Sequence, residues 1–403
     1  MRQALLPDGH RAAGSAALAT CDAAARAWRV EVATDFETVA ARWMRLAEGG
    51  AALAFQRRHW LSAWYGTIGR EPDLEPVLIT VSDPATDTDV AALPLVQRHR
   101  RDGLRIIEPA DAGMTDYNAP ILGADSPTSP RDCARMVRAV LRALPPADLF
   151  TLQKMPAFVA GRPNPFVQAR LAEPGDVQAH PLELADDLGD WEARLTKKIR
   201  GDLRRKWKSF HDMPGARLRI AESASEAAEL FDAVEVLQAR RIEHLGLPYL
   251  LGQPPFSEFY RHVALEDFAP ERMVVATLEA EGRVFAGAMG PRDGRWVGLT
   301  RLAIGLETPD ILRLSPGILL SDGLIRALHA RGVRCVDFTI GSYDYKKRLR
   351  TAEEPLFEMY RALSWRGTPR ALALRLRQRL KQERGLHEAL RRLRRGLSGR
   401  AAS

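Results

Sequence analysis

The chain has 403 residues, of which 46% are hydrophobic and 27% charged, and its net charge is +8. This composition is typical of a globular protein with an ample core, and the length favours two domains. No apolar run reaches the roughly 18–20 residues that a membrane-spanning helix needs. Three widely separated cysteines argue against a disulfide framework, and nine histidines with no pair at helical metal-binding spacing argue against a metal site.

The positive charge is concentrated in two segments. Residues 194–219 contain ten basic and two acidic side chains. Residues 366–403 contain twelve basic and two acidic side chains, a charge of +10, so the remaining residues sum to −2. Local basic patches of this kind indicate an anionic partner such as lipid headgroups, nucleotide phosphates or RNA.

The first half begins after residues 1–27, which we expect to form a flexible leader because they contain charges and no coherent hydrophobic segment. Apolar periodicity then predicts a strand, two helices, three strands, a helix and two strands. In chain order, these cover 28–33, 35–49, 55–69, 75–82, 89–99, 104–110, 129–145, 147–155 and 177–185.

The second half has the same order of elements, and its helix ends and turns are marked more clearly. Ser223 or Ser225 can cap its first helix, Gly246 can end that helix, and Asp293-Gly294 is a hairpin signal. The expected elements cover 216–223, 223–246, 256–268, 273–280, 284–290, 295–304, 314–332, 333–340 and 356–365. We therefore predict an α/β (α+β) protein with two similar domains, 28–190 and 191–365, each a mixed sheet flanked by helices.

One segment of the second half also carries a motif. LSPGILLSDGLIRALHARGVRCVDFTIGSYDYKKRL, residues 314–349, joins an S-P-G helix start to a D-F-x-x-G-x-x-x-Y-K ending. This resembles the signature of the BioF2-like, CelD-type acyltransferases, which have a tandem GNAT fold and are related to the Fem peptidoglycan transferases. Thr339 stands where that family usually has glycine or another small residue. A second stretch, TDYNAPIL at 115–122, resembles a D-Y-x-x-P stretch in the N-terminal half of the same family.

The resemblance implies an acyltransferase of the GNAT superfamily. Acetyl-CoA or another acyl-CoA would be a co-substrate, with no tightly bound cofactor. The family pattern implies that Tyr345 protonates the leaving thiol, that Lys346 meets a substrate diphosphate, and that Asp116 and Tyr117 contact substrate. The first half has no obvious phosphate loop, so we expect it to shape the cleft.

The residue types in this segment suit the same chemistry. Ser315 can cap the helix at Pro316 and Gly317, whose amides can bind pyrophosphate; a plain capped helix is the alternative. Asp337, within a buried strand, can act as a general base or orient an amine or hydroxyl, or it can form a structural ion pair. Gly341 permits a left-handed turn after the strand.

The basic segments suggest two further contacts. Residues 195–212 predict an amphipathic helix that points Lys198, Arg200 and Arg204 into a cleft between the domains, or else a linker helix with a solvated face. Residues 366–403 predict a basic amphipathic helix suited to an anionic membrane surface. RNA is the rival partner, although aromatic residues for base stacking are missing, and a solvated helix is the third alternative.

Three functions remain open at this stage. The first is acyl transfer to an amine or hydroxyl of a sugar-derived, cell-envelope or exopolysaccharide acceptor, which is a small molecule or is linked to a lipid or nucleotide. The second is Fem-like transfer from aminoacyl-tRNA to a peptidoglycan precursor, the one case that requires tRNA. The third is a non-catalytic GNAT-fold partner of a polysaccharide synthase. In each case we expect a cytoplasmic protein, peripheral on the inner face of the membrane.

Overall fold

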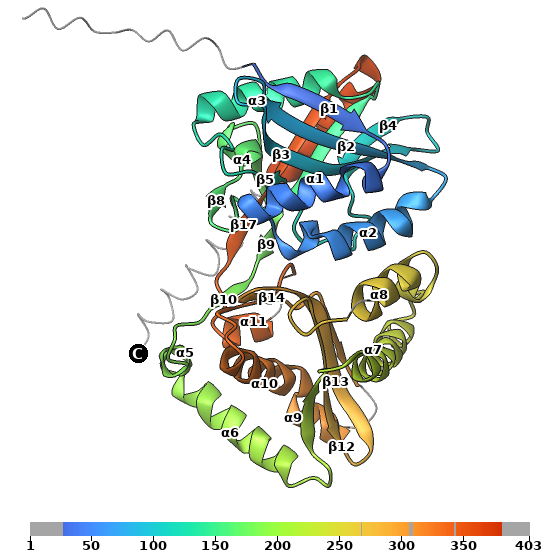
Figure 1. The fold of residues 1–403 in the computed structure, drawn as a ribbon. Helices are drawn as coiled ribbons and strands as arrows, with labels where there is room; N and C mark the ends of the chain where they lie inside the picture. The colour runs from blue at the N-terminus through green and yellow to red at the C-terminus, as the bar shows by residue number, and fades with distance from the viewer. Residues whose placement is uncertain (1–26, 267, 306–308, 342–343, 381–403) are drawn as a thin grey trace, which may run out of the picture.

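Two mixed sheets, each covered by helices, make up the protein in a computed structural model that describes residues 27–266, 268–305, 309–341 and 344–380 (Figure 1). The predicted leader lies outside the described residues except for Ala27, as does the tail beyond residue 380. Within the described helices, none combines the length and the hydropathy required to cross a bilayer.

The first sheet has the strand order β1-β2-β3-β4-β6-β17-β9, with β5 also paired to β3. Its two faces are covered by different helices, because alternate residues of a strand point to opposite sides. In β2, Leu78 packs with α1 and α2, whereas Val77 and Ile79 pack with α3. The bounds are β1 Arg29–Ala33, α1 Phe36–Gly49, α2 Arg58–Gly66, β2 Leu74–Asp83, β3 Thr88–His99, β4 Arg105–Pro109, β5 Ile121–Leu122, α3 Pro130–Ala143, β6 Leu149–Met155, β9 Glu173–Ala179 and β17 Glu354–Ala362.

The second sheet has the order β10-β16-β14-β13-β12-β11, with β15 also paired to β13. Helices α6 and α10 cover one face, and α7 and α8 cover the face toward the first half. Ser223, rather than Ser225, caps α7 by accepting a hydrogen bond from the Glu226 amide. The bounds are β10 Pro181–Glu183, α6 Lys197–His211, β11 Arg217–Ile220, α7 Ala224–His244, α8 Phe256–Leu265, β12 Met273–Ala280, β13 Arg283–Asp293, β14 Trp296–Gly298, β15 Arg301–Ile304, α10 Pro316–Ala330 and β16 Cys335–Asp337.

Shorter elements connect these. They are α4 Pro165–Gln168, α5 Gly189–Arg194, α9 Pro309–Leu314, α11 Asp344–Arg348, the hairpin of β7 Phe158–Val159 and β8 Arg162–Pro163, and the 3₁₀ turns Ala54–Gln56, Ile68–Arg70, Leu250–Gly252 and Trp365–Gly367. A last helix covers residues 368–380.

The two halves exchange strands, which the sequence did not indicate. β10 precedes the predicted boundary at residue 190, yet it pairs with β16 of the second sheet. β17, predicted as the final strand of the second domain, instead lies between β6 and β9 of the first sheet and pairs antiparallel with both. It satisfies backbone groups that would otherwise remain open on two strands. The division between the sheets therefore does not coincide with residue 190.

A single apolar cluster joins the halves. Phe259 of α8 packs edge-on against Trp60 of α2, with ring centroids 5.1 Å apart, and both side chains are buried. Nearby, the rings of Phe55 and Trp296 lie 6.0 Å apart. Arg57 also forms an ion pair of 2.8 Å with Asp293. Because one core contains residues from both sheets, we expect the halves to unfold together.

Replacing Phe259 tests this expectation. Phe259→Ala should lower the free energy of unfolding by about 3–5 kcal/mol, because it leaves a cavity against Trp60. Urea denaturation followed by fluorescence and by circular dichroism should still give one shared transition. Phe158→Ala is the control, since Phe158 is 56% exposed, and it should change stability by less than about 0.5 kcal/mol. Two separate transitions, with only one displaced by Phe259→Ala, would contradict the shared core.

Candidate functional site

The second sheet opens at the end of β16. β14 and β16 are paired in parallel from Trp296 opposite Cys335 to Gly298 opposite Asp337. The Leu299 amide then donates to the Asp337 carbonyl at 2.7 Å. Past this point β15 continues along β13, whereas the segment that follows β16 turns away from the sheet. In that segment Thr339 has a φ of 52° and Gly341 a φ of 95°. The predicted left-handed turn at Gly341 is confirmed, and a cavity of about 620 Å³ lies in the opening.

Both halves of the chain line this cavity. One wall is β15 and the other is the turn that follows β16, while α7, α11, β9 and a loop of the first half complete it. Its polar and charged lining residues are Asp116, Asp176, Gln178, His180, Gln238, Arg241, Thr300, Thr339, Tyr345 and Lys346. The cavity therefore brings together four of the residues predicted from the sequence: Asp116, Gly341, Tyr345 and Lys346.

Asp337 and Tyr117 meet directly behind this cavity. The Tyr117 hydroxyl donates to Asp337 Oδ2 at 2.8 Å, and the Thr339 amide donates to Asp337 Oδ1 at 2.8 Å. Both side chains are buried. Burial raises the pKa of Asp337 to about 6, although the Tyr117 hydroxyl, the Thr339 amide and the Lys346 charge all oppose that rise. Asp337 thus accepts hydrogen bonds from both the turn and the first half, and its role as a general base stays a prediction.

Tyr117 reaches Asp337 from an extended loop of the first sheet. β3 pairs with β4 up to Pro109 and with β5 from Ile121, so residues 110–120 bulge out between these two pairings. The second sheet has the same arrangement of β13 with β14 and β15, but there only Leu299 and Thr300 intervene. The longer bulge of the first half is what crosses to the second.

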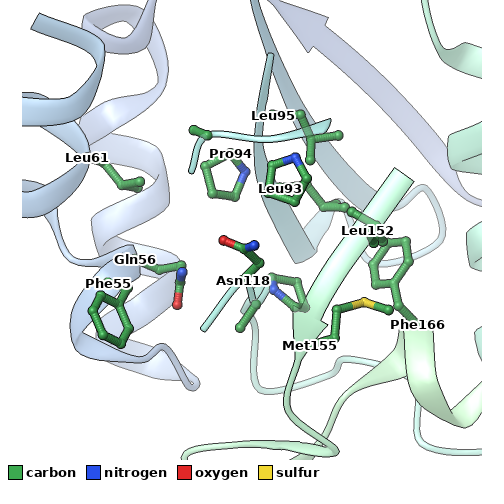
Figure 2. A pocket seen from close by; sticks show the side chains of 14 residues that line it. Phe55, Gln56, Leu61, Leu93, Pro94, Leu95, Asn118, Leu152, Met155 and Phe166 are labelled. Carbon is green, nitrogen blue, oxygen red and sulfur yellow. The ribbon is translucent and has the colours of Figure 1, made fainter. Parts of the chain in front are cut away.

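The same loop fills the cleft of its own half. The Asn118 amide donates to the Lys154 carbonyl at 3.0 Å and its side chain donates to the Gln153 carbonyl at 3.0 Å, so the loop is fastened to β6. Figure 2 shows Asn118 between Gln56 on one side and Leu152 on the other. The cavity left there measures about 20 Å³, enough for about one water molecule. In the described residues, the loop therefore leaves only a small cavity at this position of the first half.

Asp116 and its neighbours form a charged cluster at the edge of the large cavity. Asp116 is buried, and burial raises its pKa to about 6. The Lys154 charge, the Thr339 hydroxyl and the Lys346 charge oppose this rise. Lys154 also forms an ion pair of 2.6 Å with Asp111. Carboxyl groups that titrate near neutral pH are suited to proton transfer.

Lys346 has a different set of contacts from the predicted one. Its ammonium group donates to the carbonyls of Phe338 at 2.7 Å, Thr339 at 3.3 Å and Ile340 at 2.7 Å. The side chain is 1% exposed. Burial lowers its pKa to about 8, against the opposing charges of Asp337 and Asp116. Lys346 therefore fixes the turn from beneath, because α11 directs it back under residues 338–340, and its contact with a diphosphate stays a prediction.

Tyr345 is the predicted catalytic residue that lines the cavity directly. Its ring packs edge-on against Phe338, with centroids 5.8 Å apart, and the side chain is half-buried. Its role as an acid remains a prediction.

The S-P-G helix start differs from the expectation in its detail. Ser315 has a left-handed φ of 52° and its side chain forms no cap hydrogen bond, so the predicted cap is wrong; a side chain caps from extended geometry. Its hydroxyl instead accepts from Lys206 Nζ at 2.7 Å. A Cβ on Gly317 would lie 2.7 Å from Ile304, so this glycine permits close packing of α10 on β15. Lys206 was missed because it is one of ten basic residues in 194–219, and nothing in the sequence distinguishes it from the others.

The three basic residues predicted to enter the cleft lie elsewhere. Helix α6 is on the side of the second half that faces away from the first (Figure 1), because Leu203 and Phe210 bury its apolar face there. Lys198 is exposed, and Arg200 donates to the Glu192 carbonyl at 2.9 Å. Arg200 and Arg204 line a separate cavity of about 420 Å³ beside α10. Their predicted place between the domains is therefore corrected.

His180 is a site residue that sequence reasoning missed. It lies in the wall of the cavity and is 1% exposed. Neither ring nitrogen has a hydrogen-bond partner among the described residues. Burial and the Lys346 charge lower its pKa, which favours the neutral imidazole, and a neutral ring nitrogen can accept a proton. A lone histidine between two strands carries no pattern that singles it out.

Comparison with known proteins agrees with this geometry. Residues 197–347 match the family model of the acetyltransferase (GNAT) domain. The chain is similar to the crystal structure of FemX, with a TM-score of 0.54 and 10% identity over 84% of this chain and 98% of that one. It is also similar to the C-terminal domain (DUF2156) of a putative lysylphosphatidylglycerol synthetase from Agrobacterium fabrum, with a TM-score of 0.50 and 12% identity over 84% and 95%. No curated protein matches the sequence.

The family match and the two sheets define the class. The protein has a GNAT fold and is similar in structure to FemX, and the match to the GNAT domain model lies in residues 197–347. The resemblance seen in the sequence is thereby confirmed, and the first half repeats the same arrangement of strands and helices.

The buried lysine gives the first prediction from this site. Lys346→Met should lower the free energy of unfolding by about 3 kcal/mol, because three carbonyls lose a donor and two buried carboxyl groups lose a compensating charge. Lys347→Met is the matched control, because the neighbouring Lys347 is exposed, and it should change stability by less than about 0.5 kcal/mol. Equal effects in chemical denaturation would refute the placement of Lys346.

The hydrogen bond from the Tyr117 hydroxyl to Asp337 gives the second prediction from this site. Tyr117→Phe removes a donor that stabilises the ionised form of Asp337, so the pKa of Asp337 should rise above about 6. The folded state binds more protons than the unfolded state between the ordinary aspartate pKa and this raised value, so stability falls as pH rises through that window. In Tyr117→Phe the fall should extend to higher pH. Carboxyl NMR titration and denaturation at several pH values measure both; an unchanged Asp337 pKa would contradict the contact.

Proposed function

We propose that the protein transfers an acyl group from acyl-CoA, with acetyl-CoA as the first donor to test, to an amine or hydroxyl of a sugar-derived cell-envelope or exopolysaccharide acceptor. The observation that supports this most is the cavity of about 620 Å³ between β15 and the turn after β16. It combines an open strand edge with two buried carboxyl groups, Asp116 at the wall and Asp337 behind it, whose pKa values burial raises to about 6.

The strand edge suits the donor. Among the described strands, β15 pairs with β13 alone, and its other edge faces the cavity. The pantetheine arm of coenzyme A is extended and carries amides, so it can pair with an open strand edge as an added strand does. Leu302 and Ile304 line the cavity along this edge and would contact the apolar parts of the arm.

The start of α10 suits the diphosphate. Gly317 packs directly on Ile304, so the helix begins beside the same strand that lines the cavity. A helix N-terminus offers amides and the positive end of the helix dipole. Lys206 lies at this point through its hydrogen bond to Ser315, and it is also paired with Asp202 at 3.1 Å, an ion pair that a diphosphate would compete with. The thioester and the diphosphate would then lie at opposite ends of β15, with Lys206 in the role predicted for the other basic residues of α6.

The chemistry needs one base and one acid. The acceptor amine or hydroxyl attacks the thioester carbonyl, a carbon–nitrogen or carbon–oxygen bond forms, and the carbon–sulfur bond breaks. A base takes the proton that the acceptor loses, and His180 or Asp116 at the cavity wall is suited to this. Tyr345 would supply a proton to the departing thiolate. Asp337 acts as a positioning residue, because both of its oxygens are already hydrogen-bonded.

Binding of acetyl-CoA tests this proposal. Titration calorimetry and thermal melting should both detect it. Lys206→Ala should weaken binding about 10- to 100-fold, since it removes a charge-assisted contact. Lys198→Ala is the matched control on the same helix and should leave the affinity unchanged.

Two results would overturn the proposal. If acetyl-CoA and longer acyl-CoAs leave both measurements unchanged, the donor is wrong. Transfer that requires aminoacyl-tRNA would then support the Fem-like alternative, and no transfer with either donor would support a non-catalytic partner of a polysaccharide synthase. If Lys198→Ala weakens binding as much as Lys206→Ala does, the placement of the diphosphate at α10 is wrong.

A further inference from the structure

The helix of residues 368–380 has two apolar faces. Ala371 packs with Ile106 and Leu149 of the first sheet, and Leu374 packs against the same cluster. Gln378, on the same side of the helix, donates to the Glu173 and Pro174 carbonyls of β9 at 3.1 and 2.9 Å. This face of the helix packs against the first sheet.

The opposite face is apolar and exposed. Leu372, Leu376 and Leu380 are spaced four residues apart, so they form one stripe along the helix. They are 59%, 60% and 48% exposed. Trp365, in the turn that leads into the helix, is 83% exposed. Four large apolar side chains open to water along one short segment indicate an interaction surface rather than scattered surface residues.

Arginines border this stripe. Residues 366–380 contain five arginines and no acidic residue. Of these, Arg366, Arg370, Arg377 and Arg379 are exposed. The sequence continues with seven further basic and two acidic residues in 381–403, beyond the described residues. The charge of this part of the chain is therefore complementary to an anionic surface.

We propose that Trp365, Leu372, Leu376 and Leu380, with the arginines beside them, form a docking face for an anionic lipid bilayer. An interfacial helix presents leucines and an aromatic side chain to the acyl boundary and arginines to the headgroups, which is this arrangement. A nucleic acid would use the arginines but would leave the leucine stripe in water, and it would require more aromatic side chains for stacking.

The position of the docking face bears on the substrate. The helix is fixed to Glu173 and Pro174 at the start of β9, and Val177 and Gln178 of the same strand line the cavity. At about 3.3 Å per residue these positions are about 10 Å apart. A bilayer on the docking face would thus lie close to the cavity. Resting on the proposed function, this favours an acceptor that is anchored in the membrane by a lipid.

Vesicle binding by the full chain tests the docking face. The protein should co-sediment with phosphatidylcholine vesicles that contain a quarter phosphatidylglycerol, and much less with pure phosphatidylcholine. Raising the salt concentration should weaken binding because it screens the charges. The triple variant Trp365→Ser, Leu372→Ser, Leu376→Ser should lose at least about tenfold in affinity.

A matched variant serves as the control. Leu245, Leu247 and Leu250 are 58%, 57% and 61% exposed and lie in and beside the connection from α7 to α8, so Leu245→Ser, Leu247→Ser, Leu250→Ser removes similar apolar surface elsewhere. It should bind vesicles as the unaltered chain does. Both variants should keep the melting temperature and the acetyl-CoA affinity, so a failure of acyl-CoA binding and a failure of vesicle binding are separate results.

Three outcomes would overturn the docking face. The first is no preference for the anionic vesicles. The second is an equal loss of binding in both triple variants. The third is tighter binding to single-stranded RNA than to vesicles, with the leucine and tryptophan substitutions having no effect on the RNA affinity; that result would assign the arginines to nucleic acid.

Discussion

The buried hydrogen bond between Tyr117 and Asp337 is the contact on which the arrangement of the site depends. It joins side chains 220 positions apart in the sequence, one from each half. Asp337 also receives the Thr339 amide, and Lys346 binds the carbonyls of the same turn. The turn that forms one wall of the cavity is therefore held from both sides, by the loop of the first half and by α11 of the second. Because each group is buried, removing any one leaves another without its partner.

One fold is used twice here, in two different ways. In the second half, the gap that opens beside β16 is kept as a cavity of about 620 Å³. In the first half, the corresponding gap is filled by residues 110–120, which leaves about 20 Å³. The filled half then supplies Asp116 to the wall and Tyr117 to the support of the open one. The first half is thus a scaffold, and its extra loop residues explain why a D-Y-x-x-P stretch lies so far in sequence from the site that it completes.

Local patterns predicted much of this protein, and long-range packing accounts for most of what they missed. The helices that became α3 and α7 and the turn at Gly341 follow from caps, periodicity and glycine. Asp116, Tyr345 and Lys346 were found as a group from their motifs and do meet. The direction of the Lys346 side chain depends on α11. The burial of the His180 ring without a hydrogen-bond partner among the described residues depends on the strands around it. Neither feature can be predicted from the local sequence. The strand exchange of β17 was equally hard to predict, because nothing local in its sequence indicates which of the two sheets it joins.

That exchange has a consequence for how the protein is made. β17 lies between β6 and β9, although β6 is complete by residue 155 and β17 ends at residue 362. As the chain emerges from the ribosome, the first sheet must wait for almost the whole of the second half before its last gap is closed. During that interval β6 and β9 expose unpaired edges, which is where nascent chains associate with each other. The half that is synthesised first is therefore completed last, and premature termination between residues 338 and 353 would leave the second sheet with all its strands but the first sheet without β17.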